Sequence, residues 1–294
     1  MSDADIRGSL SFTRRVKGWL GTGLLGIGAF GALMALGFLL FVIVRNGLAV
    51  VDWQFLSSYP STRSAERAGV LPGIVGTIGV GLASMVVAIP VGIASAVYLN
   101  EFATTNSRTI SLLRASIANL AGVPSVVFGI LGLALFVRAL ALGNSIMAAG
   151  LTLGLLTLPI VIVVSEESLK SVPNSMREAA YGLGATPWQV VRNHVLPYSL
   201  PGMLTGSILA LSRTMGETAP LILIGAVAYT AFLPSSPLDS FTALPIQAFI
   251  WAFDARAEFQ ALAWGAAFVL IVLVLIGNLA AILLRDRYQR RYRW

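Results

Sequence analysis

Long apolar stretches alternate with short polar ones along most of the chain. Six stretches are each about 20 residues or longer, which is the length a helix needs to cross the hydrocarbon core of a bilayer. They run Trp19–Val44, Leu71–Leu99, Ala115–Val137, Ser145–Val164, Pro201–Ala228 and Ala261–Leu284. The pattern predicts an all-α membrane protein with six transmembrane helices. The composition agrees, because only 11% of the residues are charged, whereas soluble domains carry roughly a quarter.

Basic residues outside the apolar stretches predict how the helices are oriented. If the N-terminus lies in the cytoplasm, fourteen of the 20 Lys and Arg residues fall inside and five fall outside. Short cytoplasmic loops carry such an excess, so we expect an N-in, C-in protein. The inside set comprises Arg7, Arg14, Arg15, Lys17, Arg108, Arg114, Lys170, Arg177, Arg192, Arg285, Arg287, Arg290, Arg291 and Arg293. The outside set comprises Arg45, Arg63, Arg67, Arg138 and Arg256, while Arg213 lies within the fifth stretch.

These flanking residues also explain the net charge of +7. Basic side chains beside membrane helices fix topology and bind anionic lipid headgroups, so no nucleic-acid partner is indicated. We expect no cleavable signal peptide, because the first apolar stretch is too long and lacks an evident small-residue cleavage site.

Small residues and prolines within the stretches predict close helix packing. Small residues recur at every fourth position, which lets helix backbones approach closely in lipid. The two sets are Gly73, Thr77 and Gly81 in the second stretch, and Ala121, Ser125 and Gly129 in the third. Pro90, Pro124 and Pro159 are expected to kink their helices and to free backbone groups that only a protein interior can satisfy.

Three regions are expected along the chain. Residues 1–70 hold the cytoplasmic N-terminus, the first helix and a polar outer loop; residues 71–287 hold the core; residues 288–294 form a basic cytoplasmic tail. Within Tyr229–Gln260, the run ALPIQAFIWAF is too short to span a bilayer. It predicts a surface-lying or re-entrant helix near the outer face.

A polar segment separates the fourth and fifth stretches, and residues 178–197 within it read EAAYGLGATPWQVVRNHVLP. We expect a helix over Met176–Leu183 that stops at Gly184, because glycine tolerates the left-handed conformation at a helix end. Thr186 and Pro187 then start a second helix as N-cap and first residue. That helix is expected to end at Leu196-Pro197. The alternative is an ordinary amphipathic loop lying on the lipid surface.

Arg213 and Glu217 are charges within the fifth apolar stretch. Arg213 lies twelve residues past Pro201, or roughly 18 Å along a helix, which is near the middle of the hydrocarbon core. A charge at that depth is costly, so it must face the protein interior or water. Four residues apart, the two side chains share one helix face. Thr214 and Thr218 keep the neighbourhood small and polar.

The pair has two interpretations. One is a closed intrahelical salt bridge that only helps packing. The other is a way-station for an anion, because the planar guanidinium matches phosphate oxygens. Glu217 could accept a hydrogen bond from the P–OH of phosphate, whereas sulfate near pH 7 has no such proton and would be rejected by a buried carboxylate.

Several phrases of the sequence indicate a family. Glu178-Ala179-Ala180, Gly184 four residues later and Leu196-Pro197 twelve after that resemble the EAA loop of ABC-importer permeases. The phrases AGVPSVVFG, VYLNEF, GETAP, TALPIQAF and GNLAAILLR resemble the PstA-type permease of the phosphate ABC importer, over residues 71–287. The family usually has an aliphatic residue two before Leu196, where this chain has His194.

The resemblance implies a type I ABC importer permease (MetI-like) core with cytoplasmic coupling helices in a bacterial or archaeal inner membrane. The expected partners are a related permease PstC, two copies of the ATPase PstB, a phosphate-binding protein PstS, phosphate and lipid. The residues implied to contact the ATPase are Glu178, Ala179, Ala180, Gly184, His194, Leu196 and Pro197, in an EAA loop over about 166–200. The implied substrate pathway comprises Arg213, Glu217, Thr214, Thr218 and Ser125.

The chain is not expected to be an enzyme. Its only lysines, Lys17 and Lys170, stand in no phosphate-binding glycine loop, so ATP and Mg²⁺ are assigned to the partner ATPase. With no cysteine and one histidine, no metal site or other cofactor is expected. The alternatives are a permease for another oxyanion such as molybdate or phosphonate, and an ion-coupled transporter or channel. The last would need coupling residues, and the stretches offer few beyond Asn119 and Asn278. A membrane enzyme is disfavoured, since Ser125 and Ser207 have no nearby base.

Overall fold

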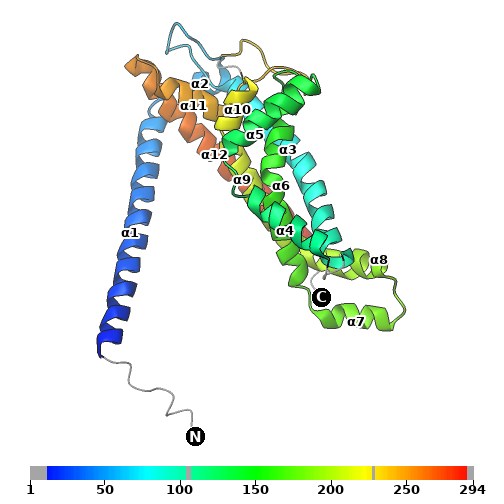
Figure 1. Cartoon of the computed structure of the whole chain (residues 1–294). Helices are drawn as coiled ribbons and strands as arrows, with labels where there is room; N and C mark the ends of the chain where they lie inside the picture. The colour runs from blue at the N-terminus through cyan, green and yellow to red at the C-terminus, as the bar shows by residue number, and fades with distance from the viewer. Residues whose placement is uncertain (1–11, 104–106, 227–228, 290–294) are drawn as a thin grey trace. The chain divides into compact units, whose positions relative to one another are not determined.

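The computed structural model describes residues 12–103, 107–226 and 229–289, and every regular element within them is a helix (Figure 1). The chain divides into two compact units, residues 1–46 and 47–294. The described residues of the first unit all belong to one helix, α1 (Phe12–Leu48), whose segment Trp19–Leu48 is long and apolar enough to cross a membrane. Arg7 and three basic residues of the expected tail, Arg290, Arg291 and Arg293, lie outside the described residues.

The second unit contains the remaining helices, including three π-helical turns labelled η. They are α2 (Trp53–Ser57), α3 (Leu71–Val97), η1 (Tyr98–Phe102), α4 (Arg108–Leu120), α5 (Ser125–Gly132), η2 (Leu133–Ala139), α6 (Ile146–Lys170), α7 (Asn174–Gly182), α8 (Pro187–Val190), η3 (Val191–Val195), α9 (Leu196–Gly216), α10 (Ala219–Ile224), α11 (Leu244–Ala252) and α12 (Ala257–Gln289). Among the described residues, five helical segments are each long and apolar enough to cross a membrane. The bent pair α4–α5 makes a sixth crossing if it is counted as one span.

Long helices α3, α6, α9 and α12 run through the second unit, with α7 and α8 at one end and α2, α10 and α11 at the other (Figure 1). Glycines bring α3 and α6 into close contact, because a Cβ on Gly92 would lie 2.6 Å from Val161 Cγ1 and one on Gly150 would lie 2.4 Å from Ala83 Cβ. Both helices continue through their internal prolines, Pro90 and Pro159. Small residues thus allow close helix contact, although these two glycines lie outside the predicted sets. Of the set predicted in α3, Gly73 lies against α11 and Gly81 lies against α9.

The predicted third span, Ala115–Val137, is wrong as a single helix. Helices α4 and α5 meet at 101° across a break of four residues. Gly122 and Pro124 lie in the break, and the proline can neither donate a backbone hydrogen bond nor leave the preceding residue helical. Ala121 caps the end of α4 and Ser125 begins α5, so Ala121 does not share a helix face with Ser125 and Gly129.

The predicted fifth span, Pro201–Ala228, is also interrupted. Helix α9 ends at Gly216, Glu217 is extended (φ −72°, ψ 126°), and α10 begins at Ala219 with Pro220 in its first turn. Glycine disfavours a helix interior, and proline is well accommodated in a first turn. The sequence Gly-Glu-Thr-Ala-Pro thus places a helix break beside the two charges.

The surface-lying or re-entrant helix expected near the outer face is α11, and its burial contradicts the surface-lying alternative. Leu244, Ile246 and Trp251 are fully buried, and α11 packs against α12 together with residues of the loop before α3. Thr77 of α3 accepts a hydrogen bond at 2.9 Å from the backbone N–H of Leu244. The loop also contributes to this core, because Phe55 and Val70 are buried in it.

Candidate functional site

Arg213 and Glu217 form an ion pair at the break between α9 and α10, with Nε 3.5 Å from Oε1. Arg213 occupies the last turn of α9, and Glu217 is the first residue after it. The predicted contact is therefore confirmed, whereas its expected position midway along a continuous helix is wrong. The pair lies where the backbone changes direction, so a change in the break would alter the distance between the charges.

Arg213 is not buried within this chain. Its side chain is 52% exposed, while that of Glu217 is 17% exposed. Thr205 and Leu209 are also exposed, at spacings of four residues along α9. One face of α9 is thus left uncovered by the second unit. The guanidinium is therefore available to a ligand or to another subunit. Glu217 pairs with it but does not bury it.

The other predicted pathway residues are arranged differently. Thr214 is buried, and its hydroxyl donates to the carbonyl of Ala210 at 2.9 Å, so it faces away from the open side of α9. Thr218 is half-buried and precedes α10 without capping it through its side chain. Ser125 begins α5, which packs on α10 where Gly129 meets Pro220. The structure gives Ser125 no side-chain hydrogen bond among the described residues.

Ser212 and Asn278 form a polar contact that the sequence analysis missed. The Ser212 hydroxyl lies 2.5 Å from Asn278 Oδ1 and also donates to the carbonyl of Ile208 at 3.0 Å. The bond joins α9 to α12 one residue before Arg213. The sequence signal was Asn278 itself, an isolated amide in an apolar helix, but nothing in the sequence places it against Ser212.

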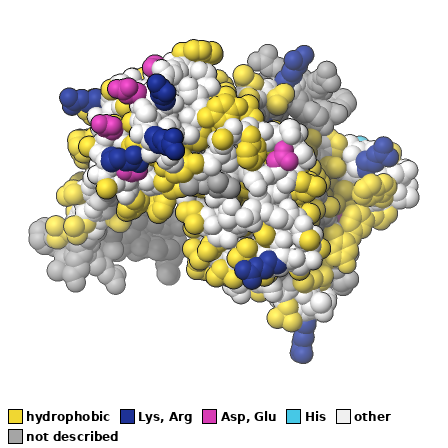
Figure 2. Space-filling model, turned by 90° about the horizontal axis from the view of Figure 1, so that it is seen from above, with side chains coloured by type: hydrophobic (Ala, Val, Ile, Leu, Met, Phe, Trp, Pro, Cys, Tyr) yellow, Lys and Arg dark blue, Asp and Glu magenta, His cyan; other side chains and the backbone are white. Residues whose placement is uncertain are grey.

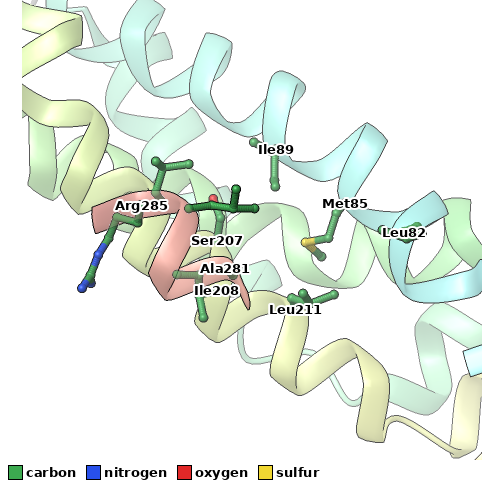
Figure 3. Close-up of a pocket in the computed structure, with 10 residues that line it drawn as sticks. Leu82, Met85, Ile89, Ser207, Ile208, Leu211, Ala281 and Arg285 are labelled. Atoms are coloured by element: carbon green, nitrogen blue, oxygen red, sulfur yellow. The ribbon is translucent and has the colours of Figure 1, made fainter. Parts of the chain in front are cut away.

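An apolar cavity of about 380 Å³ lies beside this site, between α3, α9 and α12 (Figure 3). It is lined by Leu82, Met85, Ile89, Leu204, Ser207, Ile208, Leu211, Ala281, Leu284 and Arg285. The Ser207 hydroxyl donates to the carbonyl of Met203, and the Arg285 guanidinium points away from the other labelled side chains (Figure 3). With its polar groups engaged elsewhere, this cavity is not an anion site. Arg285 instead donates to Thr205 on the open face of α9 at 3.0 Å and pairs with Asp286, whereas Arg213 is the cation that α9 itself presents on that face.

The polar segment between α6 and α9 folds as two short helices joined by a glycine turn. Helix α7 is followed by Gly184 in the left-handed conformation (φ +81°), as predicted. The Thr186 side chain accepts from the backbone of Gln189 and the Gln189 side chain accepts from that of Thr186, which makes a capping box at the start of α8. Turn and cap fix the direction in which α8 leaves α7.

The predicted end of the second helix at Leu196-Pro197 is wrong. Helix α8 passes through the π-helical turn η3 into α9, so Pro187–Gly216 is one helical segment of 30 residues. Pro197 cannot donate a backbone hydrogen bond, and the wider π turn just before it absorbs the irregularity. His194, at the position that departs from the EAA pattern, lies exposed in this turn.

The segment over α7 and α8 presents an apolar surface to solvent. Leu183 is 90% exposed, and Tyr181 and Trp188 are about half-exposed. Exposed large apolar side chains within one short segment are typical of interaction sites. The predicted docking residues do not include these three side chains, whose signal in the sequence is bulky apolar residues inside a polar loop.

The seven residues predicted to contact the ATPase are not equally accessible. Glu178, Ala179, Gly184 and His194 are exposed, and Leu196 and Pro197 are half-buried. Ala180 is buried in a core cluster with Leu169 and Val190. Of the two alanines expected to form the contact surface, only Ala179 is accessible.

The opposite end of the second unit carries charges of both signs among hydrophobic side chains (Figure 2). Asp254 accepts two hydrogen bonds from the Arg256 guanidinium, at 2.9 and 2.8 Å, and these bonds lower the pKa of Asp254 to about 2. Arg256 also donates to the carbonyl of Thr62 at 2.9 Å and lies 3.8 Å above the Phe259 ring. Burial, followed by the nearby Asp254, raises the pKa of Tyr229. Through Arg256, the cluster connects the loop before α3 to the start of α12.

Comparison with known proteins places this geometry in a family. Residues 88–294 match the family described as "Binding-protein-dependent transport system inner membrane component". The chain is 32% identical over 292 residues to "Phosphate transport system permease protein PstA 1" of Mycobacterium tuberculosis, covering 97% of this chain and 92% of that protein. It is 30% identical over 281 residues to "Probable ABC transporter permease protein YqgI" of Bacillus subtilis, covering 91% and 95%.

A solved structure supports the fold. A chain from inward-facing conformations of the MetNI methionine ABC transporter superposes with a TM-score of 0.57. The two chains are 20% identical, and the match covers 75% of this chain and 94% of that one. The all-helical arrangement is therefore the type I ABC importer permease fold predicted from the sequence.

Proposed function

The chain belongs to the family of binding-protein-dependent transport system inner membrane components, and on that premise we propose that it moves inorganic phosphate across the cytoplasmic membrane as one permease subunit of an ATP-driven importer. Relatives named as phosphate transport permeases align with almost its whole length. The observation that carries the proposal within the chain is the Arg213–Glu217 pair, which stands open at the break after α9.

Arg213 supplies the recognition in this proposal. Its guanidinium bonds Glu217 at 3.5 Å through Nε and leaves other donors free, so a phosphate oxygen can bind without the ion pair first dissociating. Glu217 accepts the P–OH of a protonated phosphate. An anion without a proton would place its charge against the carboxylate, and that repulsion favours phosphate over sulfate.

The EAA loop supplies the connection to the ATP cycle. The exposed apolar side chains of this segment are covered by a groove of a separate ATPase; they are Tyr181 on α7, Leu183 in the turn after it and Trp188 on α8. Helix α8 continues into α9 without a stop, so a displacement of the loop reaches Arg213 along one helical segment. Arg213 lies 26 residues past Pro187, or about 39 Å along the axis.

The family description supports a binding protein, and an ABC importer permease implies a partner ATPase; the identities of the remaining subunits are part of the proposal. A related permease, PstC, faces the open side of α9; two copies of the ATPase PstB bind ATP and Mg²⁺; and a phosphate-binding protein, PstS, delivers the anion outside. This chain itself performs no chemical step.

Reconstitution of the complete importer in vesicles tests this function. We expect uptake of radiolabelled phosphate that requires both ATP and the binding protein. An excess of unlabelled phosphate should compete with this uptake, and the same excess of sulfate should not. If molybdate or a phosphonate were transported in preference to phosphate, the oxyanion assignment would pass to that substrate. Uptake that persists without ATP would instead indicate a channel or an ion-coupled transporter.

A further inference from the structure

A single guanidinium connects three helical elements at the end of the molecule that carries α7. Arg177 of α7 binds Glu101 of η1 through two nitrogens, with Nη2–Oε1 at 2.8 Å and Nε–Oε2 at 3.4 Å. It also donates to the carbonyl of Leu169 at 3.0 Å and to that of Val172 at 2.7 Å. Arg177 therefore holds α7 against both the end of α3 and the end of α6.

The pair is well shielded from solvent. The Arg177 side chain is 16% exposed and that of Glu101 is 9% exposed. Asn100 donates a further hydrogen bond to Glu101 Oε1 at 2.7 Å, which orients the carboxylate. Bidentate pairs of this kind are geometrically specific as well as strong. A fully exposed surface pair would be too weak to transmit a displacement, but this one is largely covered at the wall of a polar pocket that Asn100 and Lys170 also line.

Other contacts around η1 reinforce the same connection. The Phe102 ring lies 6.5 Å from that of Trp188 in α8, so η1 contacts both helices of the loop. Arg114 of α4 donates to the carbonyl of Leu99 at 2.6 Å and lies 3.5 Å from Glu166 of α6. The end of α3 is thus tied to α4, α6, α7 and α8.

Helix α3 also reaches the neighbourhood of the proposed anion site. A Cβ on Gly81 would lie 3.4 Å from Met215 and 3.5 Å from Leu211, the residues two places on either side of Arg213. Helix α3 is itself packed closely on α6 through Gly92 and Gly150. A movement of the α3–α6 pair therefore changes the packing of α3 against the residues of α9 that flank Arg213.

We infer that Arg177 and Glu101 are positioning residues that make α7 and the α3–α6 pair move together, so that the ATPase-docking loop acts on the anion site from two sides. One connection is the continuous helix from α8 to α9, and the other runs from α7 through Arg177 to α3. This inference rests on the proposed function, because it assigns the second connection to the ATP-driven step. Neither Arg177 nor Glu101 contacts the anion.

Glu101→Gln is the direct test, measured in the complete reconstituted importer. It keeps the shape of the side chain and removes its charge, so the ATPase should still co-purify while the ATP hydrolysed per phosphate transported rises roughly fivefold, at the lower end of typical coupling between sites. Glu101→Asp keeps the carboxylate and should restore part of the coupling. Glu167→Gln is the matched control, because Glu167 is an exposed carboxylate near the end of α6 that contacts Arg177. This variant should leave the ATP hydrolysed per phosphate unchanged. If Glu101→Gln does not assemble, Arg177→Lys replaces it, because lysine keeps the charge but loses the fork.

A distance measurement separates this inference from the proposed function. The chain has no cysteine, so Val91→Cys in α3 and Ser175→Cys in α7 can each carry a single spin label. In the otherwise wild-type protein we expect one narrow distribution of the distance between the two labels, both without nucleotide and with ATP bound. In the Glu101→Gln background we expect this distribution to be broad or shifted. Unchanged distances together with an unchanged transport ratio in Glu101→Gln would overturn the inference. Failure of the wild type to transport phosphate would overturn the proposed function alone, because the label distances do not depend on the substrate.

Discussion

Arg213 and Glu217 lie on opposite sides of a helix end, with Arg213 Nε 3.5 Å from Glu217 Oε1. An ion pair four residues apart within a helix is held by the helix itself. Here the backbone turns out of α9 at Glu217, so the separation of the two groups depends on the conformation of the break. A site of this kind can change its affinity for an anion when either α9 or α10 moves.

Glu217→Gln is expected to relax selectivity while retaining transport. The amide keeps the size of the side chain and removes the negative charge that opposes an unprotonated oxyanion. Sulfate should then inhibit phosphate uptake at concentrations roughly tenfold lower than in the wild type. Competition assays in vesicles measure this change. Glu258→Gln, an exposed carboxylate at the start of α12, serves as control, and identical sulfate inhibition in Glu217→Gln and wild type would refute the role of Glu217.

Leu183→Asp is expected to weaken ATPase binding. Leu183 is the most exposed apolar side chain of the EAA loop, and a charge there must be desolvated when the partner covers it. The cost should be about 2 kcal/mol, or a loss of affinity of roughly thirtyfold. Binding of the isolated ATPase to the permease in detergent measures it. Leu238→Asp, on the outer loop, is the matched exposed leucine, and an equal loss there would indicate a non-specific effect.

Gly184→Ala and Gly182→Ala form a second matched pair. A Cβ at either glycine meets no atom within 4 Å, but only Gly184 has a positive φ, of +81°. Alanine at position 184 should strain the turn by about 1–2 kcal/mol, whereas alanine at 182 ends a regular helix. ATPase affinity should fall for the first and stay within about twofold for the second. Equal behaviour of the two variants would mean that the turn geometry does not position α8.

Acid should release the outer loop only at very low pH. The pKa of Asp254 is lowered to about 2 by hydrogen bonds from Arg256, so the folded state favours the ionised carboxylate. The stabilisation is present above the ordinary pKa of 3.8 and is lost as the pH falls through about 2. A spin label at Arg63→Cys should stay immobile down to about pH 4 and become mobile toward pH 2. Adding Asp254→Asn should give the mobile signal at pH 7, and a wild-type transition centred near neutral pH would contradict the assignment.

The sequence was sufficient for features that follow from composition and local rules. Four of the six predicted spans, the left-handed Gly184 and the Thr186 cap could be predicted because length, glycine conformation and capping act within a few residues. The family resemblance likewise came from local phrases, and the comparisons confirmed it.

Long-range contacts could not be predicted in the same way. Periodicity does not reveal that Arg177 lies against Glu101, 76 residues away, or that Ser212 lies against Asn278. The breaks at Gly122 to Pro124 and at Gly216 to Pro220 carried a sequence signal, since glycine and proline occur together in each. Hydropathy alone predicted one continuous span through each break, because the residues on either side are apolar.

The central claim is that Arg213 binds the transported anion, and ATP-driven phosphate uptake by Arg213 variants tests it most directly. Arg213→Ala should abolish uptake, and Arg213→Lys should retain only a small fraction because it keeps the charge without the planar fork. In both variants the ATPase should still co-purify. Arg138→Ala, which removes an exposed arginine of η2, should transport at the wild-type rate. Phosphate uptake by Arg213→Ala at a rate comparable to the wild type would show that the Arg213–Glu217 pair is structural and that the anion crosses elsewhere.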